Sequence, residues 1–285
     1  MSLIDLHVHS NASDGSLSPS EVVSLAAEAG LSAIALTDHD TVSGVQEALD
    51  TAADQNITVV PGVELSCLYH DREIHLLGLF INHQDPDFLK FLKDAEEKRI
   101  TRNIEMLNAF QKDGFQITED DLTCVNPKTI ITRAHFARAL VKRGYASSVD
   151  QAFKKYLNPD RPYYRKRRII TPMEALQAVI AADGFPVLAH PCLYKLGWAQ
   201  IEELIVSLTD AGMKGLECFH SSNTQNESSK LRSLALKYHL FPTGGSDFHG
   251  AAKPDIKIGC GRGKLRVPAQ YLDDIVNYRK DLKDR

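Results

Sequence analysis

The stretch Ile4-Asp5-Leu6-His7-Val8-His9 decides the fold, because polar and apolar side chains alternate along an apolar, β-rich run. Side chains alternate across a β-strand, so His7 and His9 share one face while Leu6 and Val8 share the other. Two imidazoles two residues apart on a strand can reach one metal ion. Hydrogen-bonded core histidines would explain the pair at least as well, so a metal site needs further support.

That support comes from six further strand-like runs, over 33–38, 58–65, 74–80, 186–190, 215–219 and 240–245. These runs carry or lead into metal-binding residue types, namely Asp38, His39 and Asp40, Glu64, His75, His190, Glu217 and His220, and Asp247 and His249, with Asp14 in the loop after the first run. Active sites of α/β folds form at the carboxyl ends of strands. Such groups are costly to bury unless they bind something, and nitrogen and oxygen donors without thiolate suit Zn, Mn or Fe.

Helical patterns separate most of these runs, which predicts an α/β fold. Two helix starts are well marked, at Ser18-Pro19-Ser20-Glu21 and at Thr171-Pro172-Met173-Glu174. Each combines a cap residue, a first-turn proline and a capping-box glutamate. Seven strands with intervening helices predict a parallel barrel, with a doubly wound open sheet as the competing arrangement.

The alternation stops between residues 99 and 171, where the pattern is helical over 102–113, 133–143 and 148–157. We therefore expect a barrel domain over residues 1–98 and 172–285 and an inserted helical domain over 99–171. The insertion holds 15 Lys/Arg and 7 Asp/Glu, a net charge of +8, whereas the rest of the chain has a net charge of −12. An acidic body that holds cations and a basic insertion suit an anionic substrate.

The composition is that of an ordinary globular protein, with 285 residues, 43% of them hydrophobic, and a formal net charge of −4. We expect no signal peptide and no membrane span, because the start lacks a basic and an apolar region and no apolar run approaches about 20 residues. We expect reduced thiols in a cytoplasmic protein, because the cysteines are scattered and odd in number. They are Cys67, Cys124, Cys192, Cys218 and Cys260.

Five short motifs carry a family resemblance: Asp5-Leu6-His7-Val8-His9, Thr37-Asp38-His39-Asp40, Gly62-Val63-Glu64, Ala189-His190-Pro191 and Gly245-Ser246-Asp247-Phe248-His249. In this order they resemble the polymerase and histidinol phosphatase (PHP) superfamily. With the insertion that contains Thr132-Arg133-Ala134-His135-Phe136, the chain is most similar to bacterial nucleoside 3′,5′-bisphosphate phosphatases, whose relatives also trim RNA 5′ ends. The resemblance implies a metal-dependent phosphoesterase with a distorted (β/α)7 TIM-like barrel.

The resemblance also implies a centre of three divalent metal ions, with Mn as the expected metal and Zn or Fe as alternatives. It places one ion on His7, His9, Glu64 and Asp247, a second on Glu64, His75 and His190, and a third on Asp14, His39 and His249. Glu64 would bridge the first two ions. Glu64, His39 and Asp14 are the expected catalytic residues.

A second set of residues is predicted to bind the substrate. Arg99 and Arg102 lie at i and i+3 on one helical face. Thr132 can cap a helix that begins at Arg133, and the free N–H groups of such a helix attract phosphate. We assign Arg99, Arg102, Asn103, Arg133, His135 and His220 to substrate contacts.

The roles of some polar residues stay open at this point. Asp38 or Asp40 either orients the His39 imidazole or serves turn chemistry, and Glu217 either orients a ligand or is paired with a basic neighbour. The run from Arg161 to Arg168 has five basic residues and two tyrosines. It is either a grip for a nucleic-acid backbone or a solvated face.

We expect hydrolysis of a phosphomonoester, the 3′-phosphate of a nucleoside 3′,5′-bisphosphate, with the insertion holding the second phosphate. The partner is then a small nucleotide or an RNA 5′ end, and no obligate protein partner is inferred. Three alternatives remain. They are a 5′→3′ exoribonuclease on the same metal site, a histidinol phosphatase, whose cationic substrate suits a basic insertion poorly, and a non-enzymatic metal-binding module, which the full ligand set disfavours.

Overall fold

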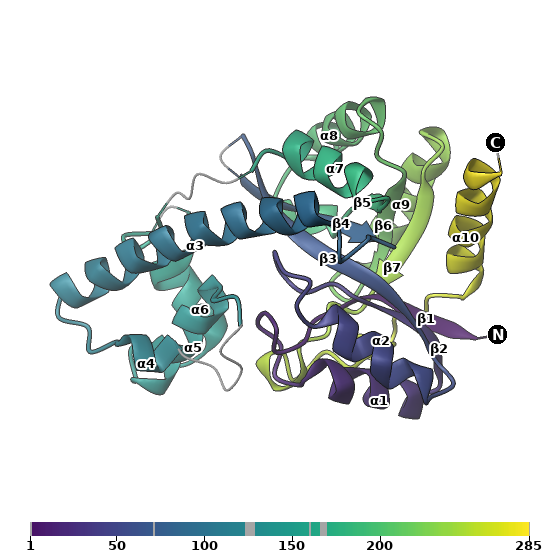
Figure 1. Ribbon diagram of the computed structural model, residues 1–285. Coiled ribbons are helices and arrows are strands. Elements are labelled where there is room, and N and C mark those ends of the chain that lie inside the picture. Colours follow the sequence, from purple (N-terminus) through teal and green to yellow (C-terminus); the bar gives the residue numbers. More distant parts are fainter. Residues whose placement is uncertain (1, 71, 123–128, 160, 166–169, 285) are drawn as a thin grey trace.

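The computed structural model describes residues 2–70, 72–122, 129–159, 161–165 and 170–284 (Figure 1). Seven strands form one sheet in which the spatial order is the chain order. They are β1 (Leu3–Val8), β2 (Leu31–Leu36), β3 (Thr58–Tyr69), β4 (Arg72–Leu79), β5 (Phe185–Leu188), β6 (Gly215–His220) and β7 (Phe241–Gly245). Strands β1 to β3 are parallel, as are β5 to β7.

The two edges of this sheet meet through the chain that follows β7. Val8 and Phe248 form a parallel bridge, Asp247 N donates to His7 O at 2.9 Å, and His9 N donates to Phe248 O at 2.9 Å. A doubly wound sheet places its first strand in the interior and reverses the strand order there. The sequential order and the joined edges therefore confirm the barrel and exclude the open sheet.

The expectation of an all-parallel barrel is wrong for one strand. β4 is antiparallel to both β3 and β5, because only two residues separate Tyr69 from Arg72 and a parallel crossover needs a much longer connection. The resulting register pairs His75 with Ser66, two residues beyond Glu64. Since side chains alternate, His75, Ser66 and Glu64 share one face of the hairpin.

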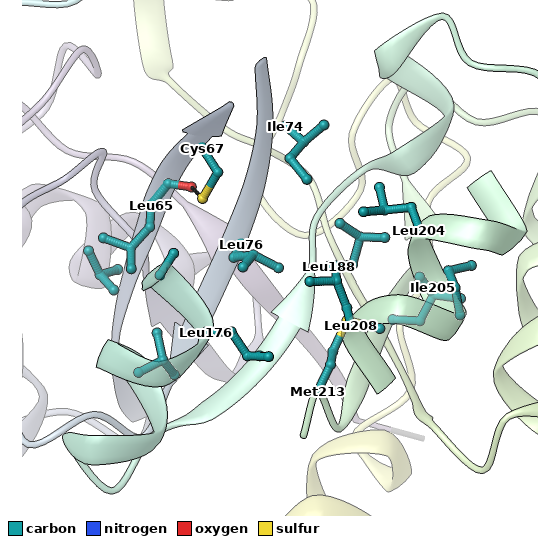
Figure 2. Close-up of a cluster of buried hydrophobic side chains, with 14 of the residues drawn as sticks. Leu65, Cys67, Ile74, Leu76, Leu176, Leu188, Leu204, Ile205, Leu208 and Met213 are labelled. Atoms are coloured by element: carbon teal, nitrogen blue, oxygen red, sulfur yellow. Dashed lines mark hydrogen bonds between the residues drawn. The ribbon is translucent and has the colours of Figure 1, made fainter. Parts of the chain in front are cut away.

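Helices cover the outside of the barrel, and the capping boxes predicted at Ser18 and Thr171 are both present. The helices are α1 (Pro19–Glu28), α2 (Val45–Ala53), α7 (Pro172–Ala181), α8 (Trp198–Asp210), α9 (Gln225–Lys237) and α10 (Gln270–Lys283). Figure 2 shows how Leu176 of α7 and Leu204 and Leu208 of α8 lie against the strand residues Leu76 and Leu188. Among the helices that the structure describes, none combines the length and apolarity needed to cross a membrane.

The insertion projects from the barrel on the long helix α3 (Pro86–Lys112), as Figure 1 shows. Helix α3 starts well before the predicted residue 102 and runs unbroken through position 99, so a continuous helix joins the two parts there. α4 (Glu119–Leu122), α5 (Arg133–Lys142), α6 (Val149–Ala152) and the π-helix η1 (Phe153–Leu157) follow. The insertion has a separate hydrophobic cluster that includes Met106, Phe110, Phe136, Leu140 and Leu157. Because this cluster is its own core, we propose that the insertion is a domain.

Gly245 at the end of β7 tests how tightly β1 and β7 approach. An added Cβ would meet the Cβ of His7 and lie 2.5 Å from the backbone N of His7. Gly245→Ala should therefore lower the free energy of unfolding by about 1–3 kcal/mol, because the backbone must shift to relieve the overlap. Urea denaturation with excess EDTA measures this. Gly197→Ala is the control, since its Cβ would meet only Gln200 Oε1 at 3.7 Å; equal stability of the two variants would contradict the proposed tight closure.

Candidate metal centre

Nine histidine and carboxylate side chains converge at one end of the barrel, where the strands lead into their loops. They form four overlapping groups in which the candidate ligand atoms lie within 4.8 Å of one another. The groups are His9, Asp14, His39 and His249; His7, Glu64 and His190; His7, His9 and Asp247; and His39, Glu64 and His75. All nine residues predicted as metal ligands are brought together, although the groups divide them differently from the three predicted sets.

Glu64 of β3 lies at the middle of this arrangement, and its two carboxylate oxygens face different imidazoles. Oε1 lies 2.8 Å from His75 Nδ1 and 2.8 Å from His190 Nε2. Oε2 lies 3.0 Å from His39 Nδ1, 3.2 Å from His9 Nε2 and 3.4 Å from His7 Nε2. Burial disfavours ionisation of Glu64, but the surrounding histidines hold the pKa of its carboxyl well below the usual value. Glu64 is therefore an anion that two groups of ligands share.

Two further carboxylates extend the centre on either side. Asp14 Oδ1 lies 3.1 Å from His249 Nε2 and 3.9 Å from His39 Nε2. Asp247 Oδ1 lies 3.4 Å from both His9 Nε2 and His249 Nδ1. Each carboxylate thus directs one oxygen toward two imidazole nitrogens.

The donor set fits divalent metal ions. His7 Nε2 and His9 Nε2 point at each other across 3.1 Å, which suits a cation between two nitrogen donors. Within the described part of the chain, the buried atoms His39 Nδ1, Glu64 Oε2 and Asp14 Oδ1 have no hydrogen-bond partner. Leaving such atoms unpaired costs free energy, and ion coordination would satisfy them. Nitrogen and carboxylate donors without thiolate suit Mn, Zn or Fe.

Glu217 of β6 orients two of these histidines, which settles a role that the sequence left open. Its Oε1 lies 3.0 Å from His7 Nδ1, and its Oε2 accepts a hydrogen bond from the backbone N of His190 at 2.6 Å. A carboxylate on Nδ1 fixes the ring and turns Nε2 of His7 toward the centre. His190 needs this support, because its backbone has a φ of 23°, which L-residues rarely adopt.

Asp38 and Asp40 hold the backbone on either side of His39 and have different partners. Asp38 accepts hydrogen bonds from Ser10 N at 2.9 Å and from the hydroxyls of Ser10 and Ser13. Asp40 accepts from Ser66 N at 2.9 Å and forms a buried ion pair with Arg99 of α3. Both carboxylates therefore fix loops that carry ligands, which favours the turn-chemistry interpretation over contact with the His39 ring.

A cavity of about 220 Å³ opens between the metal centre and the insertion. Its wall includes Asp14, His39, His75 and His249 on one side and Thr132, Arg133, Ala134 and Arg138 on the other. Arg133 lies 3.0 Å from Glu73 Oε1, and its guanidinium carbon lies 5.5 Å from the Tyr164 ring and 6.0 Å from the Phe153 ring. These contacts hold a charged, fork-shaped donor at the cavity wall.

The other predicted substrate residues have different surroundings. Arg99 lines the cavity, but its guanidinium donates to Asp40 and to Ser66 Oγ at 3.2 Å. Asn103 donates to Ile131 O at 3.0 Å, and His135 Nδ1 accepts from Thr132 N at 3.0 Å. Burial lowers the pKa of His135 to about 4. Arg102 is buried on α3, while Lys166, Arg167 and Arg168 of the basic run lie outside the described residues.

His220 lies beneath the centre, where its Nε2 is 3.5 Å from Asp247 Oδ2. Its Nδ1 accepts a hydrogen bond from Ser222 N at 3.2 Å, which leaves Nε2 on the side of the ring that faces Asp247. This arrangement gives His220 contact with a predicted metal ligand. His220 is not among the described residues that line the cavity.

Two residues at the centre were missed from the sequence. Lys253 lines the cavity and its Nζ donates to Asp247 Oδ2 at 2.6 Å. The phenol of Tyr194 joins strand ends, accepting from His75 N at 3.0 Å and donating to Ala189 O. Lys253 lies four positions after His249, and this closeness to a predicted ligand could have indicated its role. Tyr194 lies in the run Pro191-Cys192-Leu193-Tyr194, which gives no sign of a contact with His75.

Comparisons with known proteins agree with this geometry. The sequence profile of the PHP domain family matches residues 5–211. A 3′,5′-nucleoside bisphosphate phosphatase of Chromobacterium violaceum is 35% identical over 261 residues, which cover 91% of this chain and 91% of the relative. A 5′-3′ exoribonuclease of Haemophilus influenzae is 34% identical over 272 residues, covering 95% of this chain and 96% of the relative.

A solved structure extends the likeness to three dimensions. A proposed metal-dependent phosphoesterase of Bifidobacterium adolescentis matches with a TM-score of 0.84 and 26% sequence identity. The match covers 96% of this chain and 95% of that chain. The similarity therefore includes both the barrel and the insertion.

Glu217 provides a test of the metal centre. Glu217→Gln keeps the volume but removes the charge that holds His7, so the affinity for Mn should fall by about 10- to 100-fold. Isothermal titration of the metal-free protein with Mn measures this. Glu203→Gln, at an exposed position of α8, is the control and should bind as the wild type does. An unchanged affinity in Glu217→Gln would show that His7 does not need its carboxylate partner.

Proposed function

The chain belongs to the PHP domain family and is a metal-dependent phosphoesterase, and from that premise we propose that it removes the 3′-phosphate of nucleoside 3′,5′-bisphosphates. The observation that carries the chemistry is the division of the Glu64 oxygens between two groups of imidazoles. A carboxylate in that position can bridge two ions. The substrate is inferred from the cavity wall and from the relatives.

We propose a centre of three divalent ions, with Mn as the expected metal. Its sets are His7, His9, Glu64 and Asp247; Glu64, His75 and His190; and Asp14, His39 and His249. The observed groups support the first and third sets, since His7, His9 and Asp247 form one group and Asp14, His39 and His249 lie together in another. The shared Oε1 of Glu64 supports the second set, because His75 and His190 both lie 2.8 Å from it.

Ions bound here would supply Lewis acidity and an activated water for attack on phosphorus. The chain's own residues prepare that chemistry. Glu64, Asp14 and Asp247 provide the negative charge that keeps cations close together, and Glu217 holds His7 and His190 in place. Glu64, His39 and Asp14 are the proposed catalytic residues, because His39 and Asp14 also line the cavity in which the phosphate ester would lie.

The insertion supports a second phosphate site. Arg133 and Arg138 line the cavity opposite the metal centre, together with the start of helix α5 at Thr132 and Ala134. The arginine forks suit phosphate oxygens, and the positive end of the helix dipole adds to their attraction. A substrate with one phosphate on the ions would place its other phosphate against this wall. Arg99 contributes less in this proposal, since it is paired with Asp40, whereas Arg102 remains a proposed substrate contact.

A 5′→3′ exoribonuclease is the second candidate, and one observation favours it. Tyr164 belongs to the run of basic and tyrosine residues and lies against Arg133 at the cavity wall. An RNA chain that leaves the cavity on this side would therefore meet the Tyr164 ring, on which a base can stack. We also propose a cytoplasmic location, because the four described cysteines, Cys67, Cys192, Cys218 and Cys260, are free thiols. The fifth, Cys124, lies outside the described residues.

Glu64→Gln tests the bridging role. The variant keeps the volume but removes one strong bridging oxygen and its charge, so kcat should fall by about 1,000-fold or more at saturating Mn. Steady-state hydrolysis of a nucleoside 3′,5′-bisphosphate measures this. Glu97→Gln on the exposed face of α3 is the matched control. A Glu64→Gln enzyme with more than about a tenth of wild-type kcat would exclude the bridge.

Arg133→Ala tests the substrate. The wild type should prefer a nucleoside 3′,5′-bisphosphate to the 5′-monophosphate and to a short 5′-phosphorylated RNA. Arg133→Ala should lower kcat/KM for the bisphosphate by about 10- to 150-fold, because one charge-assisted contact is lost, and should affect the monophosphate much less. Arg143→Ala, whose side chain pairs with Asp121 away from the cavity, is the control. Equal losses on both substrates would remove the second-phosphate site, and faster turnover of the RNA would favour the exoribonuclease.

A further inference from the structure

The insertion contacts the metal centre directly through the loop that carries Asp14. Among the described residues, four hydrogen bonds join the two: Thr129 Oγ1 to Asn11 O at 2.6 Å, Ile130 N to Ala12 O at 3.0 Å, Thr132 Oγ1 to Asp14 Oδ2 at 3.0 Å, and Arg138 Nη1 to Asp14 O at 3.2 Å. Two of them end on Asp14, one on its backbone and one on its side chain. The position of this carboxylate therefore depends on a part of the chain about 120 residues away.

The two carboxylate oxygens of Asp14 have different partners. Oδ2 accepts from Thr132, whereas Oδ1 faces His249 and His39 and has no hydrogen-bond partner among the described residues. A carboxylate that accepts a hydrogen bond on one oxygen is held in one rotation about its χ2 bond. Its other oxygen is then directed at the two imidazoles.

Among the described residues, the hydroxyl proton of Thr132 has one available acceptor. Thr132 Oγ1 already accepts from Ala134 N at 3.1 Å, as the N-cap of α5. His135 Nδ1, at 3.3 Å, is the other acceptor nearby, but it accepts the backbone N–H of Thr132 at 3.0 Å. The hydroxyl proton therefore goes to Asp14. The start of α5 and the orientation of Asp14 are fixed by the same atom.

We propose that Thr132 is a positioning residue for the third metal ion, so that the insertion completes the ligand set that Asp14, His39 and His249 begin. The inference rests on the proposed three-ion centre. A hydrogen bond to a ligating carboxylate typically changes metal affinity by about 10- to 100-fold. Because Thr132 also lines the cavity, substrate binding against α5 and loading of the third ion are thermodynamically linked.

Three variants separate this role from helix capping. Thr132→Val removes the hydroxyl at nearly constant volume, and Thr132→Ser restores it. Thr171→Val removes a matching N-cap from α7, where the hydroxyl of Thr171 pairs with Glu174 and contacts none of the candidate ligands. Mn binding to each metal-free protein is followed by isothermal titration and by elemental analysis after dialysis, and the melting temperature is measured in EDTA.

Thr132→Val should bind one of three Mn ions about 10- to 100-fold more weakly, with the other two unchanged, while Thr132→Ser and Thr171→Val bind as the wild type does. Raising the Mn concentration should restore the activity of Thr132→Val, whereas Arg133→Ala should not respond. A wild type that binds fewer than three ions would overturn the three-ion centre and this inference together. A wild type with three ions and unchanged affinities in Thr132→Val would overturn this inference alone.

Discussion

The structure depends on one electrostatic constraint, the shared carboxylate of Glu64. Five imidazoles from four separate parts of the chain surround its two oxygens, and all of them are buried or half-buried. Such a cluster is stable only if every member is held in place and cations balance the carboxylates. Four other buried carboxylates serve the first requirement: Asp5, Asp38, Asp40 and Glu217. Asp5, for example, accepts from Ser246 N at 2.7 Å and from Gly259 N at 2.8 Å, which fixes the turn before Asp247.

The backbone around the centre carries strain that these contacts maintain. Asp40, His190 and Asp247 have φ values of 52°, 23° and 58°, in the region that L-residues rarely adopt. Each donates its backbone N–H to a partner that is itself part of the barrel: Asp40 N to Glu64 O, His190 N to Glu217, and Asp247 N to His7 O. The chain therefore turns sharply after three different strands, and each turn aims a ligand inward that a relaxed loop would direct elsewhere.

The sequence was enough to predict most of the elements and the convergence of the nine candidate ligands, because both follow from local patterns. Alternation in β1, capping boxes at Ser18 and Thr171, and acidic or imidazole groups at strand ends are all readable from neighbouring residues. The reversal of β4 depends on a two-residue connection between Tyr69 and Arg72. The alternation of strands and helices does not indicate this reversal, so it predicts one more parallel strand. The ion pair of Arg99 with Asp40, the contact of His220 with Asp247 and the role of Tyr194 could not be predicted. They depend on residues that are distant in sequence and meet only in the folded barrel.

The closure of the barrel between β1 and the chain after β7 has a consequence for biosynthesis. His7 and His9 leave the ribosome about 240 positions before Asp247 and His249, so no nascent chain that ends before Asp247 holds the full set of candidate ligands. Contacts of such sequence separation form late and slowly. Synthesis at roughly 5–20 residues per second gives the early histidines more than ten seconds without their partners. A newly made chain can therefore complete its metal centre only after Asp247 and His249 have been synthesised.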